Sequence, residues 1–407
     1  MPTIETQCCI AGGGPAGMMA GLLLARAGVS VVILEKHADF FRDFRGDTVH
    51  PSTLEVMHEL GLLDDLLQLP HQKVDHLSGQ FGDDRLRIAD FRGLPVRAPY
   101  VAMMPQWDFL SFLAGHASAY PGFRLEMNTS AQTLIEDDGQ IVGVQAIAAT
   151  GPLEVRARLT IGADGRHSTI RSAAGLKVED LGAPMDVFWF HLSRQPTDSD
   201  ESTGRFDPGQ IAVTINRNSY WQCAFVIPKG ASEAVRAKGL ADFRSKIERA
   251  IPFARDGRAA ELQSWDDVKL LSVSVDRLRV WHRPGLLMIG DAAHAMSPVG
   301  GVGINLAIQD AVAAANMLAV PLRSGTVSDS DLAAVQRRRM WPTRATQAMQ
   351  LMVQNRIVRP TLASTKPMRA PWLLRALLSV PGMRSIPARL IGLGVRPEHV
   401  RSPVAPA

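Results

Sequence analysis

The chain is poor in cysteine and has none of the sequence features of export. Among 407 residues there are three cysteines, Cys8, Cys9 and Cys223, and no two of them have the spacing of a metal site or a redox motif. The cysteines therefore support neither a disulfide framework nor a zinc site, and a reducing cytoplasm is the simplest compartment. The N-terminus lacks a basic region followed by an apolar one, and no run of 18 apolar residues occurs, so we expect neither a signal peptide nor a spanning helix.

The chain also lacks a general excess of positive charge, although its pI of about 9.1 suggests one. Residues 337–407 hold thirteen Lys or Arg against one acid, Glu398, which is a net charge of +12; the remaining 31 bases and 39 acids leave −8 for the preceding residues. A nucleic-acid partner is therefore not expected, since the positive charge is confined to one segment. With 46% hydrophobic and 21% charged residues, the composition is that of a globular protein and excludes whole-chain disorder, collagen or coiled coil.

The N-terminal residues predict a strand, a glycine turn, a helix and a second strand. The turn, Gly12 to Gly17, contains G-x-G-x-x-G, and Glu35 ends the second strand. Glycine is needed there because the turn is tight, a pyrophosphate approaches the backbone and the helix packs closely on its strand; the acid can accept ribose hydroxyls. We therefore predict a dinucleotide site in the first 36 residues that uses Gly12, Gly14, Pro15, Ala16, Gly17, Glu35 and Lys36.

Two further motifs indicate which dinucleotide binds. The segments 161–171, with Asp164 followed by Gly165, and 287–307, with Gly290-Asp291 followed by Pro298 and a glycine loop, resemble the signatures of the group A flavoprotein monooxygenases, the p-hydroxybenzoate hydroxylase-like family. The resemblance implies FAD and spans about residues 5 to 345. It assigns to FAD, besides the first turn, Arg45, Gln106, Asp164, Gly290, Asp291, Pro298, Gly301, Gly303, Ile304 and Asn305.

The physical properties of these residues agree with that assignment. Asp291 ends a buried strand, where a carboxylate can accept hydrogen bonds from ribityl hydroxyls, and the glycine loop precedes a helix whose N-terminus stabilises negative charge on a reduced flavin ring. No second G-x-G-x-x-G follows a strand, so we expect no separate nicotinamide domain, and no Cys-x-x-Cys is available to receive electrons.

The resemblance also implies an activity. NADH or NADPH would bind transiently and reduce the flavin, and dioxygen would then form a flavin hydroperoxide that hydroxylates an aromatic, phenolic or related small apolar substrate in a dry pocket. An epoxidase and a non-catalytic FAD-binding interaction protein are the alternatives. A halogenase is disfavoured, because residues 45–50 and 298–305 contain no lysine.

The order of the predicted elements indicates an α/β fold with α+β elements. We expect a discontinuous Rossmann-type FAD-binding domain with an inserted antiparallel-sheet substrate domain and C-terminal helices. The FAD-binding domain is predicted at 1–75, 98–180 and 275–345, the substrate domain at 76–97 and 181–274, and a basic helical segment at 346–407. The short alternating runs between 123 and 162 are predicted to be strands of an antiparallel accessory sheet.

The substrate pocket is expected on the inserted sheet, where alternation separates two faces without saying which faces the flavin. Trp189 and His191 share one face of their strand, opposite Phe188, Phe190 and Leu192. The residues predicted to line the pocket are Trp189, His191, Thr214, Trp221 and Cys223. His191, Asp47 and His50 compete as acid–base groups; a backbone-bound or exposed histidine is the alternative for His191. His294 is expected to be structural, and no metal site is predicted.

The basic C-terminal segment has three possible uses. Residues 372–378 and 388–393 are short apolar runs flanked by arginines. Such runs can pack on the acidic body, form a homodimer contact or lie on anionic lipid through residues 366–407; the prolines that interrupt them favour the first two. The identity of the substrate and the choice between NADH and NADPH are not encoded in any motif.

Overall fold

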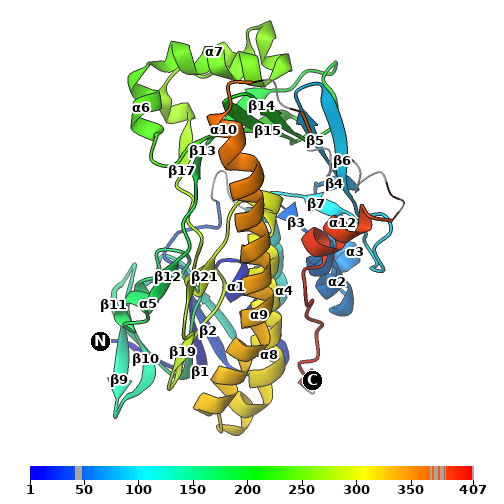
Figure 1. The fold of residues 1–407 in the computed structure, drawn as a ribbon. Helices are drawn as coiled ribbons and strands as arrows, with labels where there is room; N and C mark the ends of the chain where they lie inside the picture. The colour runs from blue at the N-terminus through cyan, green and yellow to red at the C-terminus, as the bar shows by residue number, and fades with distance from the viewer. Residues whose placement is uncertain (42–47, 367–368, 371–374, 376–379, 381, 406–407) are drawn as a thin grey trace.

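The chain folds around two large sheets that lie at opposite ends of a long helix (Figure 1). The computed structural model describes residues 1–41, 48–366, 369–370, 375, 380 and 382–405. The predictions for Arg45 and Asp47 lie outside the described residues. The helix between the sheets is α9 (Asp329–Val353), which continues through a π-helical turn (Gln354–Val358) into α10 (Arg359–Ala363).

The first sheet is an eight-stranded Rossmann-type sheet built around the N-terminal strand. Its main path runs β19-β20-β11-β1-β2-β8, parallel from β20 to β8. Off this path, β10 pairs antiparallel with β11, and β9 pairs antiparallel with β10. The bounds are β1 (Thr3–Ala11), β2 (Val31–Leu34), β8 (Phe123–Glu126), β9 (Ser130–Asp137), β10 (Gln140–Ala148), β11 (Gly151–Gly162), β19 (His282–Arg283) and β20 (Leu286–Met288). The prediction for 123–162 is therefore wrong for β8 and β11, which are parallel strands of the main sheet.

Three helices cover this sheet and form its core. They are α1 (Pro15–Arg26), α4 (Gln106–Ala117) and α8 (Gly303–Ser324), and their buried Leu, Met, Ala and Ile side chains form one cluster with β1 and β2. One helical stretch, Val299–Ser324, is long and apolar enough to cross a membrane, but its most apolar window is 83% buried inside the protein. It is the central helix of the core.

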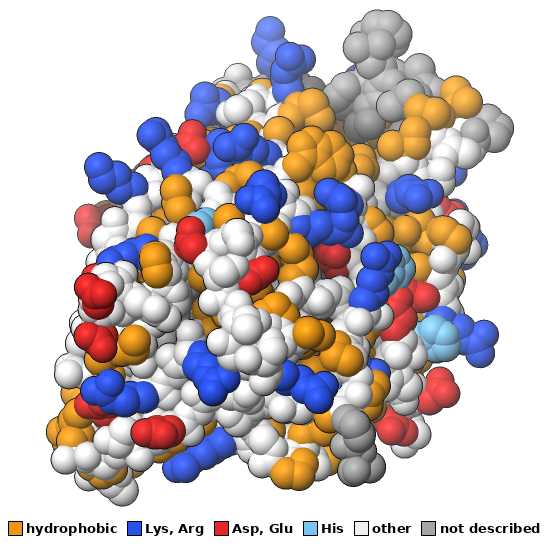
Figure 2. Space-filling model, turned by 90° about the horizontal axis from the view of Figure 1, so that it is seen from below, with side chains coloured by type: hydrophobic (Ala, Val, Ile, Leu, Met, Phe, Trp, Pro, Cys, Tyr) orange, Lys and Arg blue, Asp and Glu red, His pale blue; other side chains and the backbone are white. Residues whose placement is uncertain are grey.

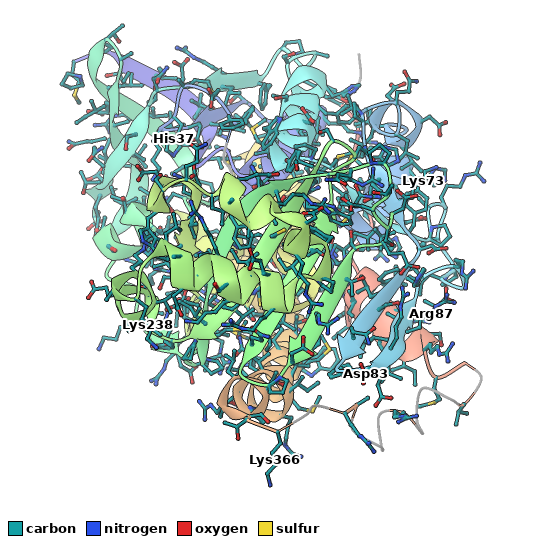
Figure 3. All side chains as sticks on the ribbon, turned by 90° about the horizontal axis from the view of Figure 1, so that it is seen from above. His37, Lys73, Asp83, Arg87, Lys238 and Lys366 are labelled. Atoms are coloured by element: carbon teal, nitrogen blue, oxygen red, sulfur yellow. The ribbon has the colours of Figure 1, made fainter. Side chains whose placement is uncertain are left out.

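The second sheet has seven strands in the order β17-β13-β16-β15-β14-β5-β6. Its strands are β5 (His76–Phe81), β6 (Asp84–Asp90), β13 (Met185–Ser193), β14 (Thr203–Asp207), β15 (Gln210–Asn216), β16 (Tyr220–Pro228) and β17 (Lys269–Leu271). Residues 76–90 thus pair with strands that follow more than 100 positions later. Figure 3 shows α7 (Leu240–Ala250) lying across the outer face of this sheet, after α6 (Ser232–Ala237).

Smaller elements connect the two sheets. One three-stranded sheet joins β3 (Thr48–Val49), β7 (Val101–Met103) and β4 (Gln72–Val74); another joins β12 (Val178–Asp180), β18 (Asp276–Leu278) and β21 (His294–Ala295). The remaining helices in the described residues are α2 (Pro51–Glu59), α3 (Leu63–Leu66), α5 (Thr169–Ala173), α12 (Ser385–Gly392) and short 3-10 turns at 252–256, 258–261, 265–267, 290–292 and 299–301.

Candidate flavin and substrate site

The glycine turn between β1 and α1 is shaped by its first and third glycines. Gly12 has φ +107°, and a Cβ there would lie 2.5 Å from the Ala163 carbonyl oxygen; a Cβ on Gly17 would lie 1.9 Å from the Gly12 carbonyl oxygen. A Cβ on Gly14 would meet nothing within 4 Å. The turn therefore keeps open space in front of Gly14, where a pyrophosphate must approach the backbone, and it fits the group that the motif predicts.

Glu35 is fixed beside this turn. Its carboxylate is 8% exposed, and it accepts hydrogen bonds from the Gly13 amide (2.9 Å to Oε2) and the His37 amide (3.0 Å to Oε1). Each carboxylate oxygen has a second lone pair, so the group can also accept hydrogen bonds from ribose hydroxyls. Lys36 follows it with an exposed side chain. Pro15 and Ala16 begin α1, whose N-terminus faces the same space.

Asp164 shapes the turn that follows β11. Its carboxylate accepts the Ser168 hydroxyl and the Ile170 amide (3.1 Å), while Ser168 caps α5. Because the backbone at 163–164 lies directly against Gly12, the second motif supports the first. Both Asp164 oxygens accept a hydrogen bond within this turn, which fixes the carboxylate beside the glycine turn.

The Gly290-Asp291 turn comes against the start of α1. Gly290 has φ +59°, and a Cβ there would lie 3.0 Å from the Ala16 Cβ, so the third motif meets the first at close range. The Asp291 carboxylate is about one third exposed and lies 3.4 Å from the Arg166 guanidinium. It is accessible from one side, which suits an acceptor of ribityl hydroxyls.

The glycine loop that follows is held by residues near the N-terminus of the chain. Gly300 and Gly301 have φ +81° and +65°, and the Gly301 carbonyl accepts the Thr48 hydroxyl (3.0 Å). Pro298 begins the loop; Gly303, Ile304 and Asn305 form the first turn of α8, and the Asn305 amide oxygen accepts the Thr53 hydroxyl (2.8 Å). The loop thus lies where the positive end of a 22-residue helix meets β3 and α2.

Two other predicted residues lie near these motifs. Gln106 is the first residue of α4 and is partly buried. His50 is 1% exposed, immediately before α2, and a Cβ on Gly301 would lie 3.4 Å from its Nε2. Burial lowers the pKa of His50 from 6.5 to about 4, so the ring is neutral at neutral pH.

Strand register decides which face of the seven-stranded sheet looks toward the flavin motifs. Trp189 is opposite Ala224, and both belong to the apolar cluster that also includes Val299 of the glycine loop. Cys223 is opposite Phe190, and Trp221 is opposite Leu192; these residues lie on the other face, in a core shared with Phe243 of α7. We call the two sides the inner face and the α7 face.

This register corrects three of the five predicted pocket residues. Trp221 and Cys223 are 1% and 0% exposed in the α7-face core, and the Trp221 indole donates to Asp198. Thr214 is opposite Cys223, so it also points to the α7 face. The prediction that these residues line the pocket is wrong because cross-strand partners share a face. Trp189 and His191 stay on the inner face.

His191 lies farther along the inner face than Trp189, near the end of β13. It lines an open hollow of about 540 Å³, and its ring centroid is 4.6 Å from that of Tyr220. The other lining residues are mostly polar or charged: Leu192, Ser193, Glu261, Leu262, Asp266, Asp267 and Lys269. Of the two described acid–base candidates, His50 is the one beside the glycine loop.

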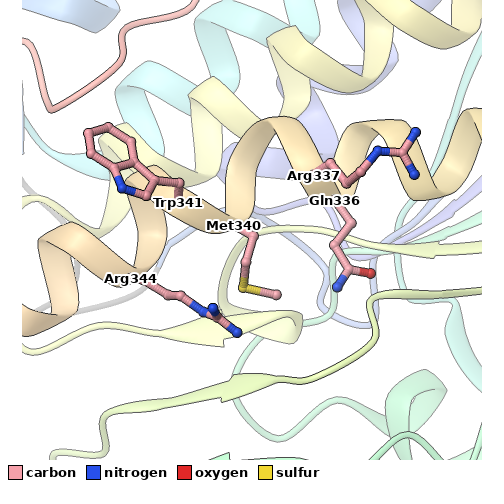
Figure 4. Close-up of a pocket in the computed structure, with 5 residues that line it drawn as sticks. All are labelled: Gln336, Arg337, Met340, Trp341 and Arg344. Atoms are coloured by element: carbon pink, nitrogen blue, oxygen red, sulfur yellow. The ribbon is translucent and has the colours of Figure 1, made fainter.

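One surface hollow lies apart from the predicted flavin residues. A surface hollow of about 290 Å³ on α9 is lined by Gln336, Arg337, Met340, Trp341 and Arg344 (Figure 4).

No cluster of three or more His, Cys, Asp or Glu that could hold a metal occurs among the described residues. The face seen from below carries basic and acidic side chains interspersed with apolar ones (Figure 2).

The sequence interpretation missed a buried charged network behind the Gly290-Asp291 turn. The Asp310 carboxylate accepts the Gly290 amide (3.0 Å), lies 2.6 Å from His294 Nε2 and pairs with Arg339 (2.9 Å). Asp310, His294 and Arg339 are each 1% exposed or less. A lone aspartate within the apolar run of α8 was the available signal, because a charge is seldom buried without a partner.

Comparisons with known proteins agree with this geometry. The family model described as "FAD binding domain" matches residues 5–350. Over 405 residues the chain is 33% identical to 6-methylpretetramide 4-monooxygenase of Streptomyces rimosus, covering 98% of this chain and 94% of that protein. It is 22% identical to para-nitrophenol 4-monooxygenase of a Pseudomonas species, over 82% of each chain.

Solved structures share the fold. The p-nitrophenol 4-monooxygenase PnpA of Pseudomonas putida superposes with a TM-score of 0.74 at 21% identity, covering 97% of this chain and all of that one. PqsL of Pseudomonas aeruginosa, described as a probable FAD-dependent monooxygenase, gives a TM-score of 0.75 at 22% identity, covering 88% of this chain and 98% of that one.

Proposed function

The chain belongs to the group A FAD-dependent aromatic monooxygenases, and from this membership we propose that it hydroxylates an uncharged polycyclic phenol, with NADH or NADPH as the electron donor. One observation carries the choice of substrate: the inner-face residues of β13, β15 and β16 include no Lys, Arg, Asp or Glu, and Lys269 of the edge strand β17, opposite Trp189, is exposed. An anionic substrate would need a paired charge in such a site. The end-to-end likeness to a protein named for a polycyclic substrate supports the same choice.

When bound, FAD supplies the redox chemistry, accepting a hydride from the reductant and passing electrons to dioxygen. The residues of the chain bind and orient it. With FAD bound, the space at Gly14 would admit the pyrophosphate, Glu35 would accept hydrogen bonds from ribose hydroxyls, and Asp291 would accept hydrogen bonds from ribityl hydroxyls. The N-terminus of α8 stabilises negative charge beside the glycine loop. We also propose direct contacts from Lys36, Gln106 and Arg45, of which Arg45 lies outside the described residues.

The inner face supplies a dry surface for the ring of the substrate. Trp189, Val213 and Val299 belong to one apolar cluster, so a planar substrate there would lose contact with water. His50 is the proposed acid–base group, because its ring is neutral and its Nε2 lies beside Gly301. Asp47 and His191 are the other acid–base candidates. Asp47 lies outside the described residues, and His191 lies at the polar end of the inner face.

The decisive experiment starts with the colour of the purified protein. We expect a yellow protein whose NADH or NADPH oxidation is accelerated by a polycyclic phenol, with one atom from ¹⁸O₂ incorporated at a ring carbon. A colourless protein that takes up no added FAD would overturn the proposal. A yellow protein whose flavin no ligand makes reducible would favour a binding protein. Label delivered across a carbon–carbon double bond would favour the epoxidase.

The C-terminal part of the chain is proposed to pack on the body. Arg338 and Arg339 both pair with Glu398, so part of the basic segment is neutralised internally. A homodimer contact and peripheral membrane binding through residues 366–407 are the alternatives. We also propose a cytoplasmic location, which agrees with a C-terminal segment that packs on the body of the protein. Weak, salt-sensitive co-sedimentation with anionic liposomes and a monomeric mass by light scattering are expected. Salt-resistant binding would instead indicate a lipid-facing segment.

A further inference from the structure

The segment at residues 385–405, which we call the C-terminal strap, wraps over the flavin-binding half. It begins with α12, whose Ala388 packs with Phe91 and Met103, and it ends where the Ala405 amide donates to the Arg26 carbonyl (2.9 Å). The strap lies beyond residue 350, where the match to the FAD-binding family model ends. Figure 1 shows it descending from α12 along the outside of α2 and α8.

The first contact of the strap with the flavin site passes through His50. The Ile391 carbonyl oxygen lies 2.9 Å from His50 Nδ1. A carbonyl only accepts hydrogen bonds, so Nδ1 carries the proton and Nε2 keeps a lone pair. Nε2 is buried and lies against the backbone of Gly301. His50 therefore stands between the strap and the glycine loop, with its tautomer fixed by the strap.

The second contact passes through a buried chain of charges. Glu398 accepts from Arg339 (3.2 Å), Arg339 donates to Asp310 (2.9 Å), and Asp310 accepts from the Gly290 amide (3.0 Å). Glu398 is 6% exposed, and the other side chains are fully buried. Charge-assisted hydrogen bonds are strong in such surroundings, and loss of one partner leaves the next charge uncompensated. This chain links the strap to the Gly290-Asp291 turn.

We propose that the C-terminal strap positions FAD, by fixing the glycine loop through His50 and the Gly290-Asp291 turn through Arg339 and Asp310. Both turns depend on glycines with positive φ, which lose more conformational freedom on ordering than other residues. A turn that is ordered before the ligand arrives does not have to be ordered by the ligand, so affinity rises. The inference rests on the flavin site described above.

The test compares strap variants that reach the flavin turns with one that does not. Glu398→Gln removes the charge facing Arg339, and His50→Ala removes the link to Ile391. His50→Asn keeps an amide N–H near the position of Nδ1. The control is Asn316→Ala, which removes the bonds to the His399 carbonyl and to the Arg401 and Ser402 amides at the far end of the strap.

The measurements are the FAD dissociation constant of each apoprotein, the visible flavin spectrum, and melting temperatures with and without FAD. Glu398→Gln and His50→Ala should bind FAD about tenfold more weakly, as loss of one charge-assisted or buried hydrogen bond implies. Both should alter the resolved structure of the flavin bands. His50→Asn should recover most of the affinity, and Asn316→Ala should keep the wild-type dissociation constant.

Two outcomes would overturn the inference. One is a wild-type FAD dissociation constant and spectrum in both Glu398→Gln and His50→Ala. The other is a variant with a lower apoprotein melting temperature that still gains the full wild-type increment on FAD addition, since this assigns the strap to general stability alone. A wild-type protein that binds no FAD at all would instead refute the proposed function, so the two failures are distinguishable.

Discussion

The glycine turn and the seven-stranded sheet both contain residues that the sequence predicts to lie in the site. The two regions differ in what determines the position of such a residue. In the turn, a Cβ on Gly12 or Gly17 would clash with nearby backbone atoms, so the two glycines are required by the geometry of the turn itself. In the sheet, alternation divides β13 into two faces, and the packing of α7 and Val299 decides which face is which. The glycine motif determines its own backbone conformation through steric contacts. An alternating strand pattern separates two faces, and only the packing of neighbouring elements shows which face is which.

The largest effect is expected within the turn itself. Gly17→Ala places a Cβ 1.9 Å from the Gly12 carbonyl oxygen, so the strand and helix must separate. We expect a loss of about 4 kcal/mol or more in the free energy of unfolding, beyond ordinary overpacking. Gly14→Ala meets nothing within 4 Å; it should change apoprotein stability by less than about 0.5 kcal/mol while weakening FAD binding at least tenfold. Urea unfolding and FAD titration measure the two quantities.

The next effect separates the faces of the sheet. Phe190→Ala leaves a cavity beside Phe243 on the α7 face and should lower the free energy of unfolding by about 3 to 4 kcal/mol, with little change in KM once the protein is folded. Trp189→Phe on the inner face should cost less than about 1.5 kcal/mol and raise KM for the substrate. If Cys223→Ala raised KM and Trp189→Phe did not, the assignment of the faces would be reversed.

A smaller effect concerns pH. Burial lowers the pKa of His50 from 6.5 to about 4, so between these values the unfolded chain binds more protons than the folded protein. The free energy of unfolding should therefore fall as pH is lowered, by up to about 3 kcal/mol from this group. Urea unfolding at pH 7, 5 and 4 measures it. His50→Asn should lose this part of the pH dependence, and an unchanged slope in that variant would show that other groups cause it.

The smallest difference is expected between the buried thiols of the two regions. Burial raises the pKa of Cys9 in β1 to about 12 and raises the pKa of Cys223 in β16 further. Neither thiol should react with a disulfide reagent in the folded protein within minutes, whereas both should react in urea. Faster labelling of Cys223, mapped by mass spectrometry, would show that the α7 face opens more readily than the Rossmann-type sheet.

Much of the flavin half could be predicted because its signals are local. Gly12, Gly14 and Glu35 lie together as their spacing implies, and Gly290 meets Ala16. The misassigned strand β11 shows the limit: its first half alternates between buried and exposed residues as an accessory strand does, and only its last four residues are all buried. Pairing with β1 depends on contacts more than 100 residues apart.

The site behind the flavin turns was less predictable for the same reason. Asp310, Arg339 and Glu398 are far apart in sequence, and no spacing rule relates them. An arginine in a basic helix is ordinarily assigned to the surface. Only the fold shows that Arg339 is buried, and the same holds for the carbonyl of Ile391 that selects the tautomer of His50.

The bond from Ala405 to Arg26 joins residues that are far apart in the chain. Residues 385–405 leave the ribosome after residues 1–34, so the strap can pack on α1, α2 and α8 only once these helices have been made. A chain that lacks residues 385–405 would also lack both contacts of the strap with the flavin turns. Such a chain should therefore bind FAD more weakly, as the strap variants should.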